Sequence, residues 1–217
     1  MSSFVVHSIP GSPYGRAVLA TLTEKGAAFC LVAPRSIKSE PHLSRHPFGR
    51  VPVLEHDGFR LYETQAILRY LDRVLPAPAL TPPDPRAAAR MDQLLCICDW
   101  YLHQGVNSII GFQRLVRPRL LGLPCDEVAV AEAIPRAQVV FAELSRLLGT
   151  NLYLAGSQMS LADILVAAHM DFIAQTPEWA PLTAARPNLP AWLSRMSSRE
   201  SFQATTWERV AAMAKAA

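Results

Sequence analysis

Long apolar runs, clusters of basic residues and a cysteine framework are all missing from this sequence of 217 residues. No apolar run approaches the ~20 residues that a helix needs to span a bilayer. The N-terminal stretch MSSFVVHSIPGSP has neither the basic start nor the longer apolar segment of a secretory signal. These absences argue against a membrane protein, and a cytoplasmic location is expected.

Cysteine is scarce and scattered. The four residues Cys30, Cys96, Cys98 and Cys125 are too few and too widely spaced for a disulfide framework. Cys96 and Cys98 lie in a stretch that is typical of a helix, where side chains at i and i+2 diverge. A shared metal ion is therefore not expected, and the sequence predicts reduced, partly buried thiols.

The charge balance also lacks the basic run that nucleic-acid binding requires. The net charge is +3. Residues 1–80 carry nine Lys and Arg against six Asp and Glu, whereas residues 81–217 carry twelve of each kind. Because the whole positive excess lies in the first part, a small anionic ligand is expected there.

The character of the sequence changes near residue 76. Five prolines fall between Pro76 and Pro85, which favours an extended, semi-rigid connector. Strand-like runs precede this connector and helical patterns follow it. We predict an α/β domain over residues 1–77, a linker over 78–84 and an all-α domain over 85–217.

The first part alternates short β-rich runs with helical ones. Asp57-Gly58 between two such runs is typical of a hairpin turn. Strand, helix, strand, hairpin and helix together predict a small α/β domain with a mixed sheet. The expected strands are Phe4–His7, Phe29–Ala33, Pro52–Glu55 and Phe59–Tyr62, the expected helices are Pro13–Lys25 and Gln65–Leu75, and Pro34–His46 is expected to be a looser polar segment.

The second part is helical. Apolar residues from Ile134 to Leu148 recur every three or four positions and stop at Gly149, which predicts a helix that ends there. Ser160 and Asp163 have the spacing of a capping box in its carboxylate form. Because capping already explains Asp163, we assign it no catalytic role.

Ser12 is the first candidate for chemistry. It precedes Pro13, a residue that suits the first helical position. The serine is explained by one of two roles. It could be only a helix N-cap. Alternatively, its hydroxyl and the free N–H groups of the helix end could stabilise a bound thiol as its thiolate, the nucleophilic form.

Four segments carry a resemblance to a known family. SPYGRAVLATLTEKG, HPFGRVP, LYETQAILRYL and GSQMSLADI have the order and spacing found in cytosolic glutathione S-transferases, over essentially the whole chain. The sequence most resembles serine-type members, such as the phi and theta classes and their bacterial relatives. The resemblance implies a thioredoxin-like domain followed by an all-helical bundle. It also implies a cytoplasmic homodimer that conjugates glutathione to hydrophobic electrophiles, as in detoxification, with no metal.

The resemblance implies a role for each residue that matches the family's motifs. Ser12 would hydrogen-bond the glutathione sulfur, and the backbone of Val51, before a cis Pro52, would pair with the cysteinyl unit. Glu63 would face the γ-glutamyl ammonium, and Thr64 would face the adjacent carboxylate. Tyrosine-type and cysteine-type mechanisms do not fit, because the sequence has neither residue at the matching position.

The glycyl end of glutathione is matched less closely. Lys38 corresponds to a lysine that lies near the glycyl carboxylate. Arg50 replaces the family's usual glutamine and could add a salt bridge or point to solvent. Ile37 replaces a histidine often found beside the lysine, and Thr64 replaces serine while keeping the hydroxyl.

The electrophile site is expected to involve aromatic and polar side chains, mainly from a segment that mixes the two more than a plain core helix would. Two other functions on the same site stay open. One is a non-catalytic binding or scaffold protein, and the other is a glutathione-dependent peroxidase, dehalogenase or isomerase. The candidate residues are Tyr14, Tyr101, His103, Asn107, Ile110, Phe112 and Trp207.

Overall fold

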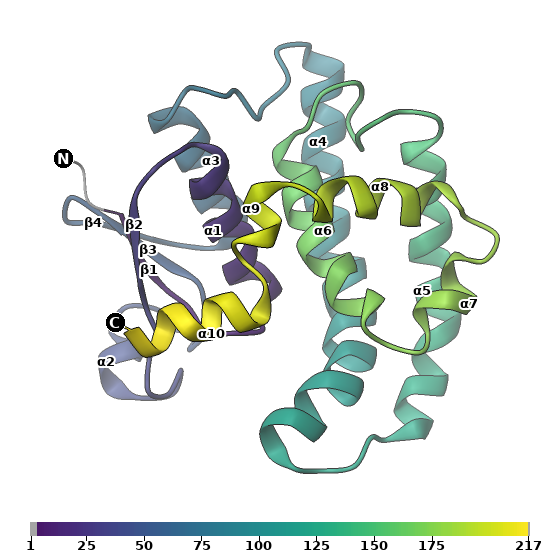
Figure 1. Cartoon of the computed structure of the whole chain (residues 1–217), viewed down its shortest axis with the longest axis horizontal. Helices are drawn as coiled ribbons and strands as arrows, with labels where there is room; N and C mark the ends of the chain where they lie inside the picture. The colour runs from purple at the N-terminus through teal and green to yellow at the C-terminus, as the bar shows by residue number, and fades with distance from the viewer. Residues whose placement is uncertain (1–3, 217) are drawn as a thin grey trace. The chain divides into compact units, whose positions relative to one another are not determined.

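A computed structural model describes residues 4–216 of the chain (Figure 1). The chain forms two compact units. The first combines the residues up to Thr81 with those from Ser198 onward, and the second covers Pro82–Ser197. The predicted boundaries at 77, 78 and 84 stay a prediction.

The first unit is built on a four-stranded mixed sheet in the order β2-β1-β3-β4. The β1 strand runs parallel to β2 and antiparallel to β3, which forms a hairpin with β4. The predicted hairpin is confirmed, with positive φ angles of 49° and 84° at Asp57 and Gly58. The strands are β1 (Phe4–His7), β2 (Phe29–Val32), β3 (Val53–His56) and β4 (Phe59–Tyr62).

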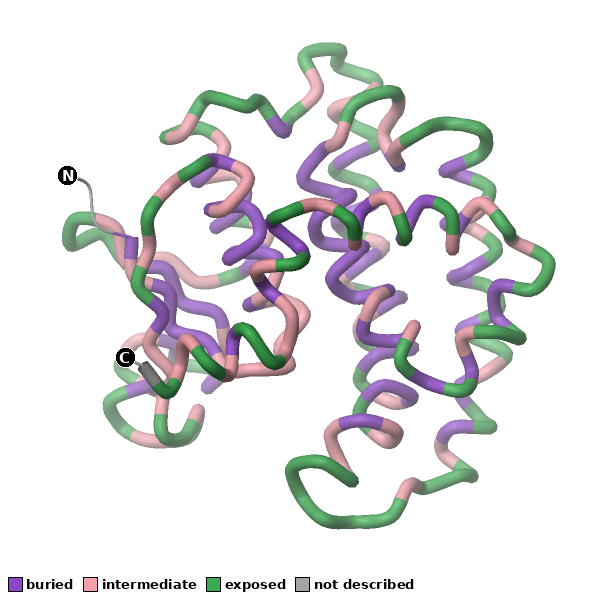
Figure 2. Tube along the Cα trace, in the orientation of Figure 1, coloured by how far each residue is buried: buried purple, intermediate pink, exposed green. Residues whose placement is uncertain are grey.

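One face of the sheet is apolar and lies against two helices, α1 (Pro13–Glu24) and α3 (Thr64–Val74). Val6, Leu54 and Ile67 in this layer have no exposed surface. Figure 2 shows the buried colour along the strands and along these helices. This packing fixes the positions of both helices, and therefore the positions of their N-termini.

The opposite face of the sheet is polar and meets the segment that contains the short helix α2 (Glu40–Leu43). Neighbouring strands bring Glu55 and Arg60 together on this face, with Nε and Oε1 3.0 Å apart. Arg60 also donates to the carbonyl of Ser44 at 3.2 Å, and the His46 ring lies 4.7 Å from that of Tyr62. Side-chain polar contacts therefore hold this segment on the sheet.

A buried ion pair fastens the proline-rich connector to the first unit. Lys25 Nζ contacts Asp72 and the carbonyl of Pro78, and its side chain has no exposed surface. Asp72 also accepts hydrogen bonds from the N–H of Leu80 and the hydroxyl of Thr81. The start of the connector is thus bound to both α1 and α3.

The C-terminal segment completes the first unit. It contains α9 (Glu200–Gln203) and α10 (Trp207–Ala216). Arg199 forms a bidentate ion pair with Glu24, at 2.7 and 2.8 Å, and the Arg16 guanidinium lies 5.0 Å from the centre of the Phe202 ring. The segment is therefore fixed along α1.

The second unit is an all-helical bundle around α6, which is buried over most of its length (Figure 2). The predicted capping box at Ser160 and Asp163 is confirmed. Asp163 also accepts hydrogen bonds from Leu154 N–H at 2.8 Å and Trp192 Nε1 at 2.9 Å, which supports its structural role. The helices are α4 (Pro85–Ile97), η1 (Cys98–Leu121, π-type), α5 (Glu127–Leu148), α6 (Leu161–Ala174), α7 (Trp179–Thr183) and α8 (Asn188–Ser197).

Several predicted bounds need correction. The segment Pro34–His46 contains the helix α2, with Ser39 at its N-cap position and Pro41 in its first turn. The third strand begins at Val53 because Pro52 has no N–H to pair with a neighbour, and it includes His56, which pairs with Phe4 and Phe59. The helix expected from Gln65 begins one residue earlier.

Among the described residues, no helix is long and apolar enough to cross a membrane. No group of three or more histidine, cysteine, aspartate or glutamate side chains within residues 4–216 could hold a metal ion. All four cysteines are free thiols, as predicted, but Cys30 and Cys96 are exposed rather than partly buried. Burial raises the pKa of the Cys98 thiol well above its usual value.

Candidate functional site

Ser12 caps the N-terminus of α1. Its Oγ accepts a hydrogen bond from the N–H of Gly15 at 3.1 Å, and Pro13 occupies the first turn. Because a hydroxyl can accept and donate at the same time, this cap leaves the Ser12 proton as a donor. The positive end of the α1 dipole adds a favourable field for an anion at this position.

Two close contacts fix the loop that carries Ser12. Gly11 has a φ of +79°, and a Cβ placed there would lie 2.6 Å from the Trp207 ring. A Cβ on Gly15 would lie 1.9 Å from Ser8 Oγ, just after β1. Both glycines are thus required by close packing, which holds the first turn of α1 against the sheet and against Trp207.

The Val51–Pro52 peptide bond is cis, as the resemblance implied. Val51 is half-buried and stands just before β3, whose pairs with β1 and β4 begin at Val53. Its backbone therefore lies beyond the residues of β3 that pair with β1 and β4.

Lys38 and Arg50 are both exposed and lie around one tight turn. A Cβ on Gly49, whose φ is +59°, would lie 3.2 Å from Lys38 Nζ and 2.9 Å from the carbonyl oxygen of Ile37. The structure thus brings the Lys38 ammonium beside the turn that leads into Arg50 and Val51. These two cations are part of the positive excess noted in the first part of the sequence.

Glu63 and Thr64 start α3. Glu63 is the N-cap residue, with a φ of +70° and no side-chain capping bond, and it is exposed. A left-handed backbone at a residue other than glycine costs of order 1 kcal/mol or more and is typical of functional positions. Thr64 is only 8% exposed. The exposed carboxylate therefore lies beside the N–H groups of the first turn of α3, where the helix dipole is positive.

Sequence reasoning missed two histidines, His42 and His46, which lie in the segment that joins β2 to β3. His42, in α2, places Nε2 2.7 Å from the carbonyl oxygen of Arg50. Burial lowers the pKa of His46, an effect that nearby Glu63 only partly offsets. The signal was a pair of histidines four residues apart in a segment expected to be loose.

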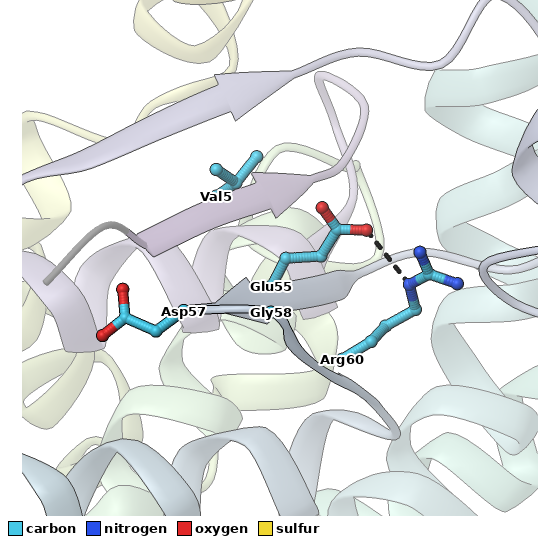
Figure 3. A pocket seen from close by; sticks show the side chains of 5 residues that line it. All are labelled: Val5, Glu55, Asp57, Gly58 and Arg60. Atoms are coloured by element: carbon cyan, nitrogen blue, oxygen red, sulfur yellow. Dashed lines mark hydrogen bonds and ion pairs between the residues drawn. The ribbon is translucent and has the colours of Figure 1, made fainter.

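The polar face of the sheet also has a hollow of about 290 Å³ lined by Val5, Glu55, Asp57, Gly58 and Arg60 (Figure 3). Arg60 reaches toward Glu55 there, and Asp57 points away from both. Burial alone would raise the pKa of Glu55, but hydrogen bonds from Arg60 and His7 lower it. None of the predicted glutathione residues lines this hollow.

The predicted electrophile residues fall into two groups. Tyr14 and Trp207 are half-buried parts of the first unit. In the second unit, Tyr101 and Phe112 are exposed, whereas His103 is half-buried with its ring against that of His169. The remaining two point to the bundle core: Asn107 donates to the carbonyl of His169 at 3.0 Å, and Ile110 has no exposed surface.

Comparison with known proteins supplies the family. Residues 6–79 match the glutathione S-transferase N-terminal domain, and residues 106–200 match the glutathione S-transferase C-terminal domain. The chain belongs to the glutathione S-transferase family. The predicted thioredoxin-like domain followed by an all-helical domain is therefore confirmed.

The proteins similar to this family member include plant phi-class glutathione S-transferases. A probable glutathione S-transferase GSTF2 of Oryza sativa subsp. japonica is 32% identical over 189 residues, covering 85% of this chain and 87% of the rice protein. Glutathione S-transferase 3 of Zea mays is 31% identical and covers 94% of each chain. A glutathione S-transferase-I structure with bound lactoylglutathione is 28% identical, has a TM-score of 0.82, and covers 97% of this chain and 99% of its own.

Proposed function

We propose that this glutathione S-transferase family member is an active transferase that binds glutathione on its first unit and stabilises the thiol as a thiolate. The observation that carries the proposal is the Ser12 hydroxyl at the N-terminus of α1, with its proton left to donate. A thiolate in front of this helix end would accept that proton in a hydrogen bond and lie in the favourable field of the helix.

The energy required is within reach of these two effects. A free thiol with a pKa near ~8.5 is only a few per cent ionised at neutral pH. Making the bound thiol mostly thiolate takes about 2 kcal/mol, at ~1.4 kcal/mol per pKa unit. A hydrogen bond to an anion contributes about 1.5–3 kcal/mol, and a helix end adds about 0.3–1 kcal/mol. The thiol proton passes to solvent. The sulfur then forms a bond to the electrophilic carbon as the bond from that carbon to its leaving group breaks, so that an aryl chloride would release chloride ion.

The rest of glutathione finds complementary groups on the same unit. Glu63 would pair with the γ-glutamyl ammonium, and Thr64 with the carboxylate beside it. The Val51 backbone would pair with the cysteinyl unit, while Lys38 and Arg50 would face the glycyl carboxylate. The lactoylglutathione complex of a similar family member supports glutathione as the ligand class.

The electrophile residues and the oligomer belong to the same proposal. Tyr14 and Trp207 are the first unit's candidates for contact with a hydrophobic electrophile, and Tyr101, His103 and Phe112 are the second unit's. Asn107 and Ile110 are explained by the bundle core. Family membership supports a cytoplasmic homodimer.

The test is a pH titration of thiolate absorbance for glutathione bound to the wild type and to Ser12→Ala. We expect a pKa of the bound thiol well below the free value in the wild type and a rise toward that value in the variant. Turnover should fall about 30-fold, the equivalent of 2 kcal/mol, and the glutathione Kd should change by no more than a few-fold.

Ser108→Ala is the matched control, because this exposed hydroxyl donates only to the Gln104 carbonyl within its own helix. It should leave the pKa of the bound thiol unchanged. Normal glutathione affinity with an unshifted thiol pKa would refute the transferase mechanism and favour the binding-protein alternative, in which Ser12 is a helix cap only.

A further inference from the structure

His42 makes a buried contact that the proposed chemistry does not use. The residue is 2% exposed, and its Nε2 lies 2.7 Å from the carbonyl oxygen of Arg50. A carbonyl oxygen can only accept, so Nε2 must carry the proton and donate it. The contact therefore requires a proton on Nε2 of the imidazole.

A histidine at this position carries an energetic cost, because its second ring nitrogen is buried without a partner in the described part of the chain. Nδ1 of His42 is buried and has no hydrogen-bond partner among the described residues. A buried ring nitrogen without a partner is unfavourable, and an apolar ring of similar size would fill the same space without this cost. Packing alone thus does not explain the histidine, whereas the bond to Arg50 does.

The Arg50 carbonyl stands at the centre of the glycyl and cysteinyl end of the proposed site. The next residue, Val51, carries the backbone that would pair with glutathione. On the other side of the turn, Gly49 lies against Lys38 and Ile37. A shift of the Arg50 carbonyl would move the Val51 backbone and change its distance from the Lys38 ammonium.

The turn is also joined to α2 through the backbone. His46 N–H donates to the His42 carbonyl and Gly49 N–H to the His46 carbonyl, at 2.9 and 2.8 Å. The His42 side chain adds a link that skips this turn and reaches Arg50 directly. Together these bonds close the segment from His42 to Arg50 into a ring.

We infer that His42 is a positioning residue for glutathione: its Nε2–H bond to the Arg50 carbonyl holds the Val51 backbone and the Lys38 ammonium in the arrangement that receives the cysteinyl and glycyl units. The inference rests on the proposed function, because it assigns a role within that site. His42 touches no reacting atom. Its loss should therefore weaken glutathione binding and spare the chemical step.

Two variants separate the donor from the ring. His42→Phe keeps the ring volume and removes the donor, whereas His42→Gln keeps an N–H near the Nε2 position. We expect the glutathione Kd, measured by calorimetry, to rise about tenfold in His42→Phe, which corresponds to about 1.4 kcal/mol. His42→Gln should return it to within about threefold of the wild type. The kcat with saturating glutathione and an activated aryl chloride should change less than about threefold in both.

His56→Phe is the matched control. This half-buried histidine bonds the Tyr70 hydroxyl at 2.7 Å on the other face of the sheet. Its loss should lower the Tm and leave the glutathione Kd unchanged. A wild-type Kd in His42→Phe, or a Kd in His42→Gln as weak as in His42→Phe, overturns the inference while the proposed function stands.

Failure of the proposed function gives a different result. A wild-type chain that binds no glutathione refutes that function and this inference with it. If His42→Phe does not fold, nitrogen NMR of the wild-type imidazoles decides the question. An Nε2 of His42 that carries no proton contradicts the inference. A proton on Nε2 that exchanges more slowly when glutathione is bound supports it.

Discussion

The two faces of the sheet in the first unit hold the proposed glutathione residues by different means. On one face, α1 and α3 pack against fully buried side chains such as Val6 and Leu54, and their N-termini present Ser12 and Thr64. On the other face, the α2 segment that carries Lys38 and Arg50 is held largely by polar contacts to imidazoles, carboxylates and guanidiniums.

This difference separates two parts of the proposed function. The positions of the thiol-activating hydroxyl and of the α3 N-terminus depend on apolar packing, which does not titrate. The cysteinyl and glycyl end depends on groups whose charge and hydrogen bonds change with pH and salt. Thiol activation should therefore be robust to conditions under which glutathione affinity is not.

The largest effect should come from breaking the buried Lys25–Asp72 ion pair, which joins α1 to α3. Asp72→Asn removes the charge that balances Lys25, whose side chain has no exposed surface. Breaking a buried ion pair from one side costs about 3–5 kcal/mol, so the free energy of unfolding should fall by about that amount in urea titrations. At temperatures where the variant is folded, the glutathione Kd should stay near the wild-type value.

Glu143→Gln provides the comparison for Asp72→Asn, because Glu143 pairs with Arg146 one helical turn away on the surface. Solvent-exposed pairs of this kind contribute little, and the free energy of unfolding should be nearly unchanged. Equal stability of Asp72→Asn and Glu143→Gln would mean that the Lys25–Asp72 ion pair does not stabilise the packing of α1 and α3.

The next largest effect should be on glutathione affinity and not on the stability of the fold. Glu63→Gln keeps the shape and the left-handed backbone of the α3 N-cap and removes its charge. Hydrogen bonds to charged groups contribute about 1.5–3 kcal/mol, so the glutathione Kd should rise at least about tenfold. Glu132→Gln, an exposed residue of α5, is the control. An unchanged Kd in Glu63→Gln would contradict the assignment of Glu63 to the γ-glutamyl ammonium.

The apolar face was predictable from the sequence because its signals are local. Ser12-Pro13 marks a helix start, and Asp57-Gly58 marks a hairpin, within a few residues each. The polar face was not, since the bond from His42 to Arg50 joins residues that only the tertiary turn brings together. The electrophile residues were hardest to predict. Asn107 and Ile110 belong to the same mixed aromatic and polar segment as exposed Tyr101 and Phe112, and the fold shows that the first two face the core.

The last effect should be a pH dependence, which within the first unit comes from the polar face. In the second unit, burial lowers the pKa of His169 to about 3, so that unit should have a pH dependence of its own. Burial lowers the pKa of both His7 and His46 in the folded chain, so the unfolded chain binds more protons as the pH falls below about 6.5. The free energy of unfolding should therefore decrease from that pH downward, by at most about 1.4 kcal/mol per pH unit for each histidine. Carboxylates whose pKa values are lowered, Glu55 and Asp72 among them, act only further down, below about pH 4.5.

Hydrogen exchange can assign this loss to one face. Between pH 6.5 and 5, after correction for intrinsic rates, the residues of the α2 segment should lose protection while α1 and α3 keep theirs, because only the α2 face contains His7 and His46. His46→Phe keeps a ring against Tyr62 and removes one titrating group, so it should flatten the pH dependence. A uniform loss of protection over α1, α2 and α3 would show that the two faces unfold as one, and the distinction between robust activation and condition-dependent affinity would fail with it.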